Sequence, residues 1–226
     1  MNSAGFNAYK VRYRTAIQQV LSESEPGRLD ENGFPAYSHS NPLINWLFWN
    51  RLHTVINYVE RNAPYECVLD FGCGSGVMLP FLAEVSRQVI ASDIDLLPLK
   101  HMQHHIPLAA NVTVHDASKD PQPDVPAASI DLIIALDVLE HVRDLSPTLS
   151  RLLGLLKHGG QLIISGPTEN VLYRFGRRLA GPEYSGDYHE RSVGEIRQAL
   201  ARQVNISHIA TLYWPVPLFE IFAAIP

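Results

Sequence analysis

The residues best suited to binding a ligand form a glycine-rich turn directly after a short apolar run. Gly72, Gly74 and Gly76 occupy every second position, and residues 67–71 before them have the composition of a buried parallel strand. Glycine allows a tight turn and leaves the backbone open to a ligand, because it has no side chain. A helical apolar pattern follows at once, so we predict a strand, a turn and a helix that bind a nucleotide-like ligand.

The spacing of the glycines argues against two common nucleotide-binding turns. A dinucleotide-binding turn has the pattern G-x-G-x-x-G, but here the third glycine comes one residue early and Val77 occupies the later position. A phosphate-binding P-loop needs a Lys followed by Ser or Thr, which this turn lacks. The turn by itself therefore predicts another type of ligand, or a glycine-rich turn without one.

Acids follow the next two predicted strands. Asp93 comes directly after residues 88–92, and Asp116 comes directly after residues 111–115. Parallel strands place their carboxyl ends at one edge of a sheet, so both acids are expected near the glycine turn. Each can accept hydrogen bonds from a ligand or can simply cap the next helix. Asp95 competes with Asp93 for the first role, but Asp93 is nearer the end of its strand.

The alternation of strands and helices predicts an α/β fold with a doubly wound, Rossmann-like sheet. We expect seven mostly parallel strands, helices on both faces and an antiparallel hairpin at the C-terminus. The predicted strands are 67–71, 88–92, 111–115, 130–135, 161–165, 206–213 and 218–223. The predicted helices are about 76–86, 96–102, 138–157 and 192–203, with Gly159 and Gly160 as a C-cap for the third and Ser192 as the N-cap of the fourth.

Two regions are expected to lie outside this alternating pattern. Residues 1–40 predict an N-terminal arm or cap, with a helix at 8–21 and an irregular loop at 22–40. Residues 41–226 predict the main domain, which opens with a helix capped by Asn41 and started by Pro42. Within it, residues from about 167 to 191 carry Pro and Gly breaks and a polar cluster, which predict a substrate-binding insertion with a short helix at about 169–179.

Taken together, these motifs resemble the class I S-adenosylmethionine (SAM)-dependent methyltransferases. The acid-x-Gly-x-Gly-x-Gly turn resembles the first motif of that family. Residues 136–142 (Leu-Asp-Val-Leu-Glu-His-Val) resemble the post-strand motif of its small-molecule branch, which includes the O-methyltransferases of ubiquinone biosynthesis. The Asn/Asp-Pro-Pro-aromatic motif of the amino-group methyltransferases is missing. The resemblance covers about residues 42–166 and implies SAM as the cofactor.

The resemblance also implies a role for each residue at the predicted edge of the sheet. Backbone N–H groups of the turn would hold the carboxylate end of SAM, Asp93 would hold the ribose and Asp116 the adenine. The sulfonium and its methyl group would face the end of the fourth strand. The implied cofactor-binding residues are Asp70, Gly72, Cys73, Gly74, Gly76, Asp93, Ile94, Asp116, Ala117 and Leu136.

Two histidines are candidates for a general base, which would help a hydroxyl acceptor. His141 follows the fourth strand on the side of the methyl group, and the alternative is a helix residue bonded to nearby backbone. His189 lies in the polar cluster of the insertion, where the alternative is a solvated loop. Tyr184 and Tyr188 are candidates to line the same pocket. Trp46 could wall the pocket or could pack in the core with its aromatic neighbours.

Composition limits the class of protein. The chain has 226 residues, 46% of them hydrophobic and 18% charged, which suits one globular α/β domain. The net charge of -5 argues against a nucleic-acid partner. No apolar run reaches the roughly 20 residues of a membrane span, and no signal peptide is evident. We therefore expect a cytoplasmic protein with free thiols at Cys67 and Cys73, no metal, and an oligomeric state left open, a homo-oligomer included.

The function favoured by the sequence is direct in-line transfer of a methyl group from SAM to a small molecule, with a hydroxyl oxygen as the favoured acceptor atom. Such a reaction depends chiefly on alignment in a dry site. The acceptor could be amphipathic. The largely apolar residues 214–225 could contact a lipidic acceptor or a partner chain, or could complete the core. Two alternatives remain: a protein or nucleic-acid methyltransferase, and a SAM-binding partner subunit without turnover.

Overall fold

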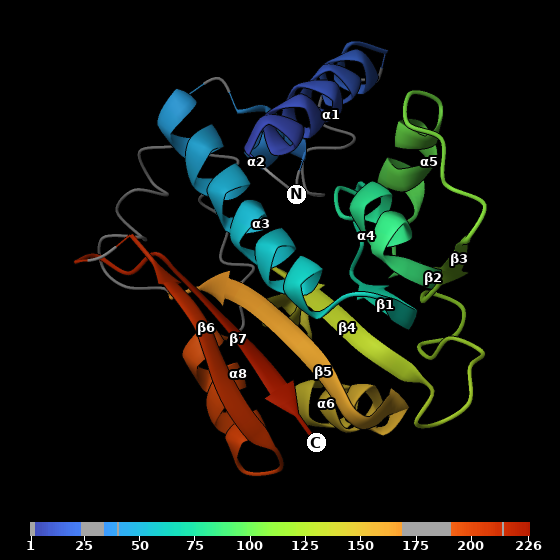
Figure 1. Ribbon diagram of the computed structural model, residues 1–226, viewed down its shortest axis with the longest axis vertical. Helices are drawn as coiled ribbons and strands as arrows, with labels where there is room; N and C mark the ends of the chain where they lie inside the picture. The colour runs from blue at the N-terminus through green and yellow to red at the C-terminus, as the bar shows by residue number, and fades with distance from the viewer. Residues whose placement is uncertain (1–2, 24–33, 40, 169–190, 214) are drawn as a thin grey trace.

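The computed structural model describes residues 3–23, 34–39, 41–168, 191–213 and 215–226 (Figure 1). Its strands are β1 (Tyr65–Phe71), β2 (Ser86–Asp93), β3 (Val112–Asp116), β4 (Ile130–Leu136), β5 (Leu156–Pro167), β6 (Asn205–Leu212) and β7 (Phe219–Ile225). Its helices are α1 (Ser3–Glu23), α2 (Phe34–Ser38), α3 (Pro42–Asn62), α4 (Leu79–Val85), α5 (Leu97–Gln103), α6 (Leu145–Leu155) and α8 (Val193–Ala201), with a 3-10 turn η1 (Leu139–His141). None of the described helices is long and apolar enough to span a membrane.

The seven strands form one sheet in the order β3-β2-β1-β4-β5-β7-β6. β1 to β5 pair in parallel, whereas β7 is antiparallel to both β5 and β6. The predicted doubly wound fold with a C-terminal antiparallel hairpin is therefore confirmed. The strand order reverses between β1 and β4, and in such sheets ligands bind at the carboxyl ends beside that reversal.

Two hydrophobic layers cover the two faces of the sheet, and Figure 1 shows helices on both faces. Helices α1 to α5 contribute to one layer, and helices α6 and α8 contribute to the other. Successive residues of each inner strand alternate between the layers, so that Val68 joins the first and Leu69 the second, both fully buried. Burial on both faces explains why the inner strands have almost continuous apolar sequences.

Helix α3 begins where the sequence predicts. The Asn41 side chain accepts a hydrogen bond from the Leu43 N–H at 2.9 Å, and Pro42 is the first helical residue. The stretch before it differs from the prediction of an irregular loop, because α2 forms a short helix there. Phe34 and Tyr37 are buried in the same core as α3, and the Tyr37 carbonyl accepts hydrogen bonds from Asn45 and Trp49. These tertiary contacts stabilise a turn that the local sequence does not specify.

Several predicted boundaries are wrong. Helix α1 begins at Ser3 and not at residue 8, and the helix predicted at 138–157 is divided into η1 and α6, which begins at Leu145. Helix α4 begins at Leu79, three residues later than expected, because the residues after the glycines continue as turns. Helix α6 ends at Leu155, and β5 begins at the next residue. Gly159 has φ +79° and lies inside β5, whose pairing with β4 shifts register between Ile130 and Leu132. The Gly159-Gly160 pair thus belongs to an irregularity in a strand and is not a helix C-cap.

Ser192→Ala should lower the free energy of unfolding by about 1 kcal/mol, because Ser192 forms a reciprocal capping box with Glu195. The Ser192 hydroxyl accepts from the Glu195 N–H, and the Glu195 carboxylate accepts from the Ser192 N–H at 2.7 Å. Urea denaturation of both proteins measures the difference. Ser146→Ala, at an exposed position of α6, is the control and should change stability much less. Equal stabilities of the Ser192 variant and the wild type would contradict the capping role.

Candidate active site

The glycine turn after β1 requires glycine for two reasons. Gly72, Gly74 and Gly76 have φ values of +75°, +52° and +80°, a region that other residues rarely adopt. A Cβ atom on Gly72 would lie 2.4 Å from Val138 Cγ2, and one on Gly76 would lie 2.7 Å from Leu99 Cδ1. The turn is therefore packed closely against the residues that follow β4 and against α5.

The N–H groups of this turn donate hydrogen bonds within the protein. Gly72 and Cys73 donate to the Ser92 carbonyl at 2.8 and 3.1 Å, and Gly74 donates to Asp93 Oδ2 at 2.7 Å. The Gly76 N–H donates to the Cys73 carbonyl at 2.8 Å. The turn is thus tied to the end of β2, and these four N–H groups are not free for a ligand's carboxylate. A backbone donor for the charged end of a ligand must therefore be a group other than these four.

The structure brings the predicted residues of β2 and β3 together. Asp93 and Asp116 are direct partners in the parallel pairing, and the Ala117 N–H donates to the Asp93 carbonyl at 2.9 Å. Ile94 is 75% exposed, although it is a large apolar residue beside a carboxylate. Asp95 instead accepts from the Leu97 N–H at the start of α5. Asp93 is therefore the better placed of the two acids to accept hydrogen bonds from a ligand at the glycine turn.

Asp93 keeps hydrogen-bonding capacity although both of its oxygens already accept hydrogen bonds. Oδ2 accepts from Gly74, and Oδ1 accepts from the Asp95 N–H at 3.0 Å. Each carboxylate oxygen has two acceptor positions, so two hydroxyl groups of a ligand can still bind. The two backbone bonds fix the orientation of the carboxylate before a ligand arrives.

Asp116 is bound mainly to its own loop. Its Oδ1 accepts from the Ser118 hydroxyl at 2.5 Å, and its Oδ2 lies 2.8 Å from Lys119 Nζ. Hydrogen bonds from Lys119 and Ser118 lower the pKa of Asp116 to about 2. The carboxylate therefore stays ionised throughout the neutral range.

Asp70, the acid at the end of β1, has the opposite electrostatic environment. It is 4% exposed, and burial, with a contribution from the Asp93 charge, raises its pKa to about 7. Burial also raises the pKa of the neighbouring Cys73 thiol. Asp70 is thus a carboxyl group that changes charge near neutral pH, directly below the glycine turn.

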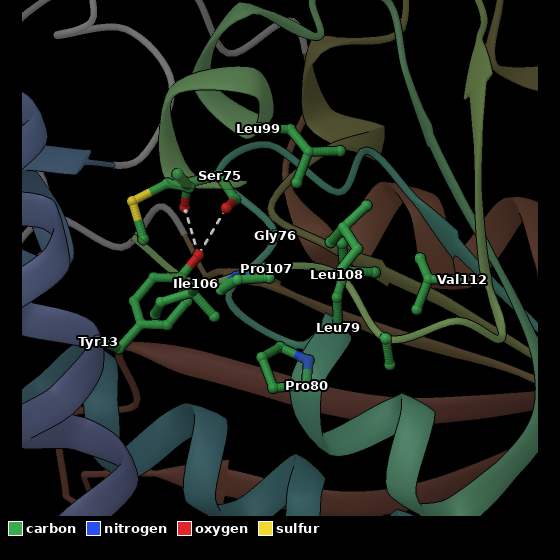
Figure 2. A pocket seen from close by; sticks show the side chains of 12 residues that line it. Tyr13, Ser75, Gly76, Leu79, Pro80, Leu99, Ile106, Pro107, Leu108 and Val112 are labelled. Carbon is green, nitrogen blue, oxygen red and sulfur yellow. Dashed lines mark hydrogen bonds between the residues drawn. The ribbon is translucent and has the colours of Figure 1, made fainter. Parts of the chain in front are cut away.

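Two tyrosines of α1 donate hydrogen bonds to backbone carbonyls in and directly after the glycine turn. The Tyr13 hydroxyl donates to the Ser75 carbonyl at 2.6 Å, as Figure 2 shows, and the Tyr9 hydroxyl donates to the Val77 carbonyl. Burial raises the pKa of both phenols, so they remain neutral donors. The pocket drawn in Figure 2, behind Ser75 and Gly76, has a volume of about 20 Å³, which is room for about one water molecule. This pocket is too small for a nucleotide-sized ligand, which must bind on the open side of the turn.

The end of β4 carries an ion pair that our sequence reasoning missed. Asp137 follows β4 with φ +52°, and its Oδ2 pairs with Nη1 of Arg51, a fully buried residue of α3. Arg51 Nη2 donates to the Tyr37 hydroxyl at 3.3 Å. The available signal was a cationic residue on the apolar face of α3, in helical spacing with Phe48 and Val55.

The structure describes two of the five predicted catalytic and acceptor-binding residues. His141 is exposed at the end of η1, where its N–H donates to the Val138 carbonyl at 3.1 Å. Trp46 is 49% exposed and lies 5.3 Å from the Tyr213 ring, whereas Trp49 takes the buried position on α3. The remaining three, His189, Tyr184 and Tyr188, lie outside the described residues.

Residues 39–216 match the model of a family described as a methyltransferase domain. The chain is 30% identical over 124 residues to a "probable S-adenosylmethionine-dependent methyltransferase" of Mycolicibacterium smegmatis, covering 53% of this chain and 46% of that protein. It is 28% identical over 158 residues to a ubiquinone biosynthesis O-methyltransferase of Pseudomonas fluorescens, covering 68% of this chain and 62% of that protein. The chain spans about half the length of the first curated relatives that it matches.

A solved structure has the same fold. The N-methyltransferase NodS from Bradyrhizobium japonicum, in complex with S-adenosyl-L-homocysteine, superposes with a TM-score of 0.61. The similarity covers 95% of this chain and 98% of that one, at 15% sequence identity. At this identity the match supports the architecture, and the residues of the site must be judged from this chain alone.

Proposed function

Since the chain belongs to the methyltransferase-domain family of class I SAM-dependent methyltransferases, we propose that it transfers a methyl group from SAM to a hydroxyl oxygen of a small molecule. The observation that carries this proposal is the cluster of Asp93, Ile94, Asp116 and Ala117 against the glycine turn, at the carboxyl ends of β1 to β3. A carboxylate and an exposed apolar side chain at that position suit a ribose and an adenine ring.

The residues at this edge of the sheet fit SAM in part. Asp93 would accept from the two ribose hydroxyls, and Ile94, with the loop at Asp116 and Ala117, would contact the adenine. Leu136 and Asp137 would border the methyl group. The remaining predicted contacts, Asp70, Gly72, Cys73, Gly74 and Gly76, would form the floor of the site without donating their bonded N–H groups. SAM supplies a methyl group activated on a sulfonium, so the protein needs mainly to bind and align.

Aromatic side chains keep the region around the turn dry. Tyr13, Tyr37 and Trp49 come from α1, α2 and α3, and each is at most 8% exposed. Their rings contact one another at centroid distances of 5.5 and 6.2 Å around Trp49. This packing excludes water on the α1 side of the turn, whereas the cofactor would bind on the open side, where Ile94 is 75% exposed.

We assign the acceptor side to the residues after β4 and to the insertion at about 167–191. His141 lies close to the end of β4 and would take the proton of a hydroxyl acceptor, with His189 as the second candidate. Trp46, Tyr184 and Tyr188 would line the acceptor pocket. The acidic net charge of -5 and the O-methyltransferase among the relatives support a small-molecule acceptor.

Calorimetry with SAM, S-adenosylhomocysteine (SAH) and NAD tests the cofactor. We expect SAM and SAH to bind and NAD to release no heat. Incubation with methyl-labelled SAM and a panel of phenols and catechols then tests the acceptor, and label should appear in the organic extract. Binding of NAD without SAM would overturn the cofactor assignment. Label in protein or RNA would overturn the small-molecule acceptor, and no transfer at all would favour a non-catalytic subunit.

A further inference from the structure

We propose that Arg51 is a charge-compensating and positioning residue for Asp137, and that this pair sets how strongly the site prefers a cationic ligand over its neutral counterpart. The inference rests on the proposed function, because it assumes that SAM binds at the carboxyl ends of β1 to β4. It concerns two residues that lie 86 positions apart in the chain and meet at the end of β4.

Burial of the Arg51 guanidinium requires nearby groups that offset the cost of removing its charge from water. The residue is 0% exposed, and its guanidinium lies 5.1 Å from the Phe48 ring and 4.9 Å from the Phe219 ring. Contacts of a cation with two aromatic faces are favourable, but burying a charge is costly unless an opposite charge is paired with it. Asp137 supplies that charge.

The cationic side of the pair is fully buried, and the anionic side is partly exposed. The side chain of Asp137 is 29% exposed, against 1% for Arg51. Asp137 Oδ1 is itself buried and has no hydrogen-bond partner among the residues that the structure describes. The Asp137 carboxylate therefore combines one oxygen held by Arg51 with another that has unused acceptor capacity.

Asp137 lies beside the glycine turn. The next residue, Val138, is the one that a Cβ on Gly72 would meet at 2.4 Å. The Asp137 N–H donates to the Ser165 carbonyl at 2.9 Å, which holds the residue in its left-handed conformation at φ +52°. Residues other than glycine rarely adopt such a conformation, and it persists where surrounding contacts impose it. Asp137 is thus fixed at the border of the expected methyl position.

The proposed reaction explains why the carboxylate should be compensated. Positive charge on sulfur disappears as the methyl group leaves. A bare carboxylate nearby would therefore stabilise the bound cofactor more than the transition state, and this would slow the reaction. Arg51 cancels most of that field, because its guanidinium is paired directly with the Asp137 carboxylate.

The affinities for SAM, which is cationic at sulfur, and for SAH, which is neutral there, test this inference by calorimetry. Arg51→Met retains a long side chain between the two Phe rings but removes the positive charge. We expect the ratio of SAM affinity to SAH affinity to rise about tenfold in that variant. In Asp137→Asn, which leaves Arg51 uncompensated, the ratio should fall by a similar factor. The double variant should return close to the wild-type ratio.

Arg51→Lys keeps the charge and should keep the ratio, and Arg61→Met, at an exposed position of the same helix, is the matched control. Thermal denaturation checks that each variant folds. If Arg51→Met does not fold, Asp137→Asn decides the question, because Asn keeps the size of the side chain and an oxygen that can still accept a hydrogen bond from Arg51. An unchanged ratio in the folded single variants would overturn the inference. Wild-type protein that binds neither SAM nor SAH would instead refute the proposed function.

Discussion

Asp93→Asn should lower the affinity for SAM by about a hundredfold. The substitution removes the charge and replaces one acceptor oxygen by an N–H₂ group, so the side chain can no longer accept from both ribose hydroxyls. Charge-assisted hydrogen bonds of this type contribute about 1.5–3 kcal/mol each. Calorimetric titration with SAM measures the loss.

The effect on the fold should be much smaller than the effect on binding. The amide introduced by Asp93→Asn keeps one acceptor oxygen, which the N–H groups of Gly74 and Asp95 must now share, so we expect stability to fall by about 1 kcal/mol. Asp95→Asn is the matched control, because its remaining oxygen can still accept from the Leu97 N–H. Affinity lost in the Asp95 variant and kept in the Asp93 variant would reverse the assignment of the two acids.

The sheet could be predicted because its signals are local. The inner strands are apolar runs that end in Gly or Asp, and their alternation with helices predicts parallel pairing. Asp93 and Asp116 could be placed together for the same reason, since parallel pairing puts the ends of neighbouring strands side by side. Their pairing in the structure confirms that step.

Contacts between distant parts of the chain could not be predicted in this way. The Tyr13 hydroxyl bonds a carbonyl 62 residues away, and Arg51 pairs with an acid on another element. The turn N–H groups donate to the end of β2, so a pattern typical of a free anion site forms an internal hydrogen-bond network instead. The sequence shows which donors are available, but their acceptors depend on how the elements pack.

The same dependence on contacts between distant residues explains the two errors in predicted local structure. A Gly-Gly pair after a helical pattern is typical of a C-cap. Here the residues from 156 onward belong instead to β5, which pairs with β4. Helix α2 forms because Phe34 and Tyr37 are buried against α3. Tertiary packing outweighs local propensity in both places.

The free energy of unfolding should fall by about 3 kcal/mol between pH 5 and pH 8 through Asp70 alone. Its pKa is about 7 in the folded protein and 3.8 in the reference state, so the folded protein holds this proton more tightly. The stabilisation is complete below pH 3.8 and is lost as the pH rises through 7. The cause is the cost of burying the charged carboxylate.

The comparison of wild type with Asp70→Asn, by urea denaturation at several pH values, isolates this effect. The difference is needed because the chain has 10 histidines, which titrate in the same range. The variant should gain stability relative to the wild type as the pH rises from 5 to 8. Asp116→Asn is the control, because the pKa of Asp116 is about 2 and its charge does not change in this window. A constant difference for Asp70→Asn would show that Asp70 does not titrate there.

The two predictions are physically linked, because the charge of Asp93 contributes to the raised pKa of Asp70. Asp93→Asn removes that charge, so the pH at which stability falls should move to a lower value. The shift should be partial, since burial is the larger cause and is retained in the variant. SAM affinity and the midpoint of the pH dependence should therefore change together in Asp93→Asn, whereas Asp95→Asn should change neither. A full return of the Asp70 transition to the range of an exposed carboxyl would mean that the Asp93 charge, and not burial, controls Asp70.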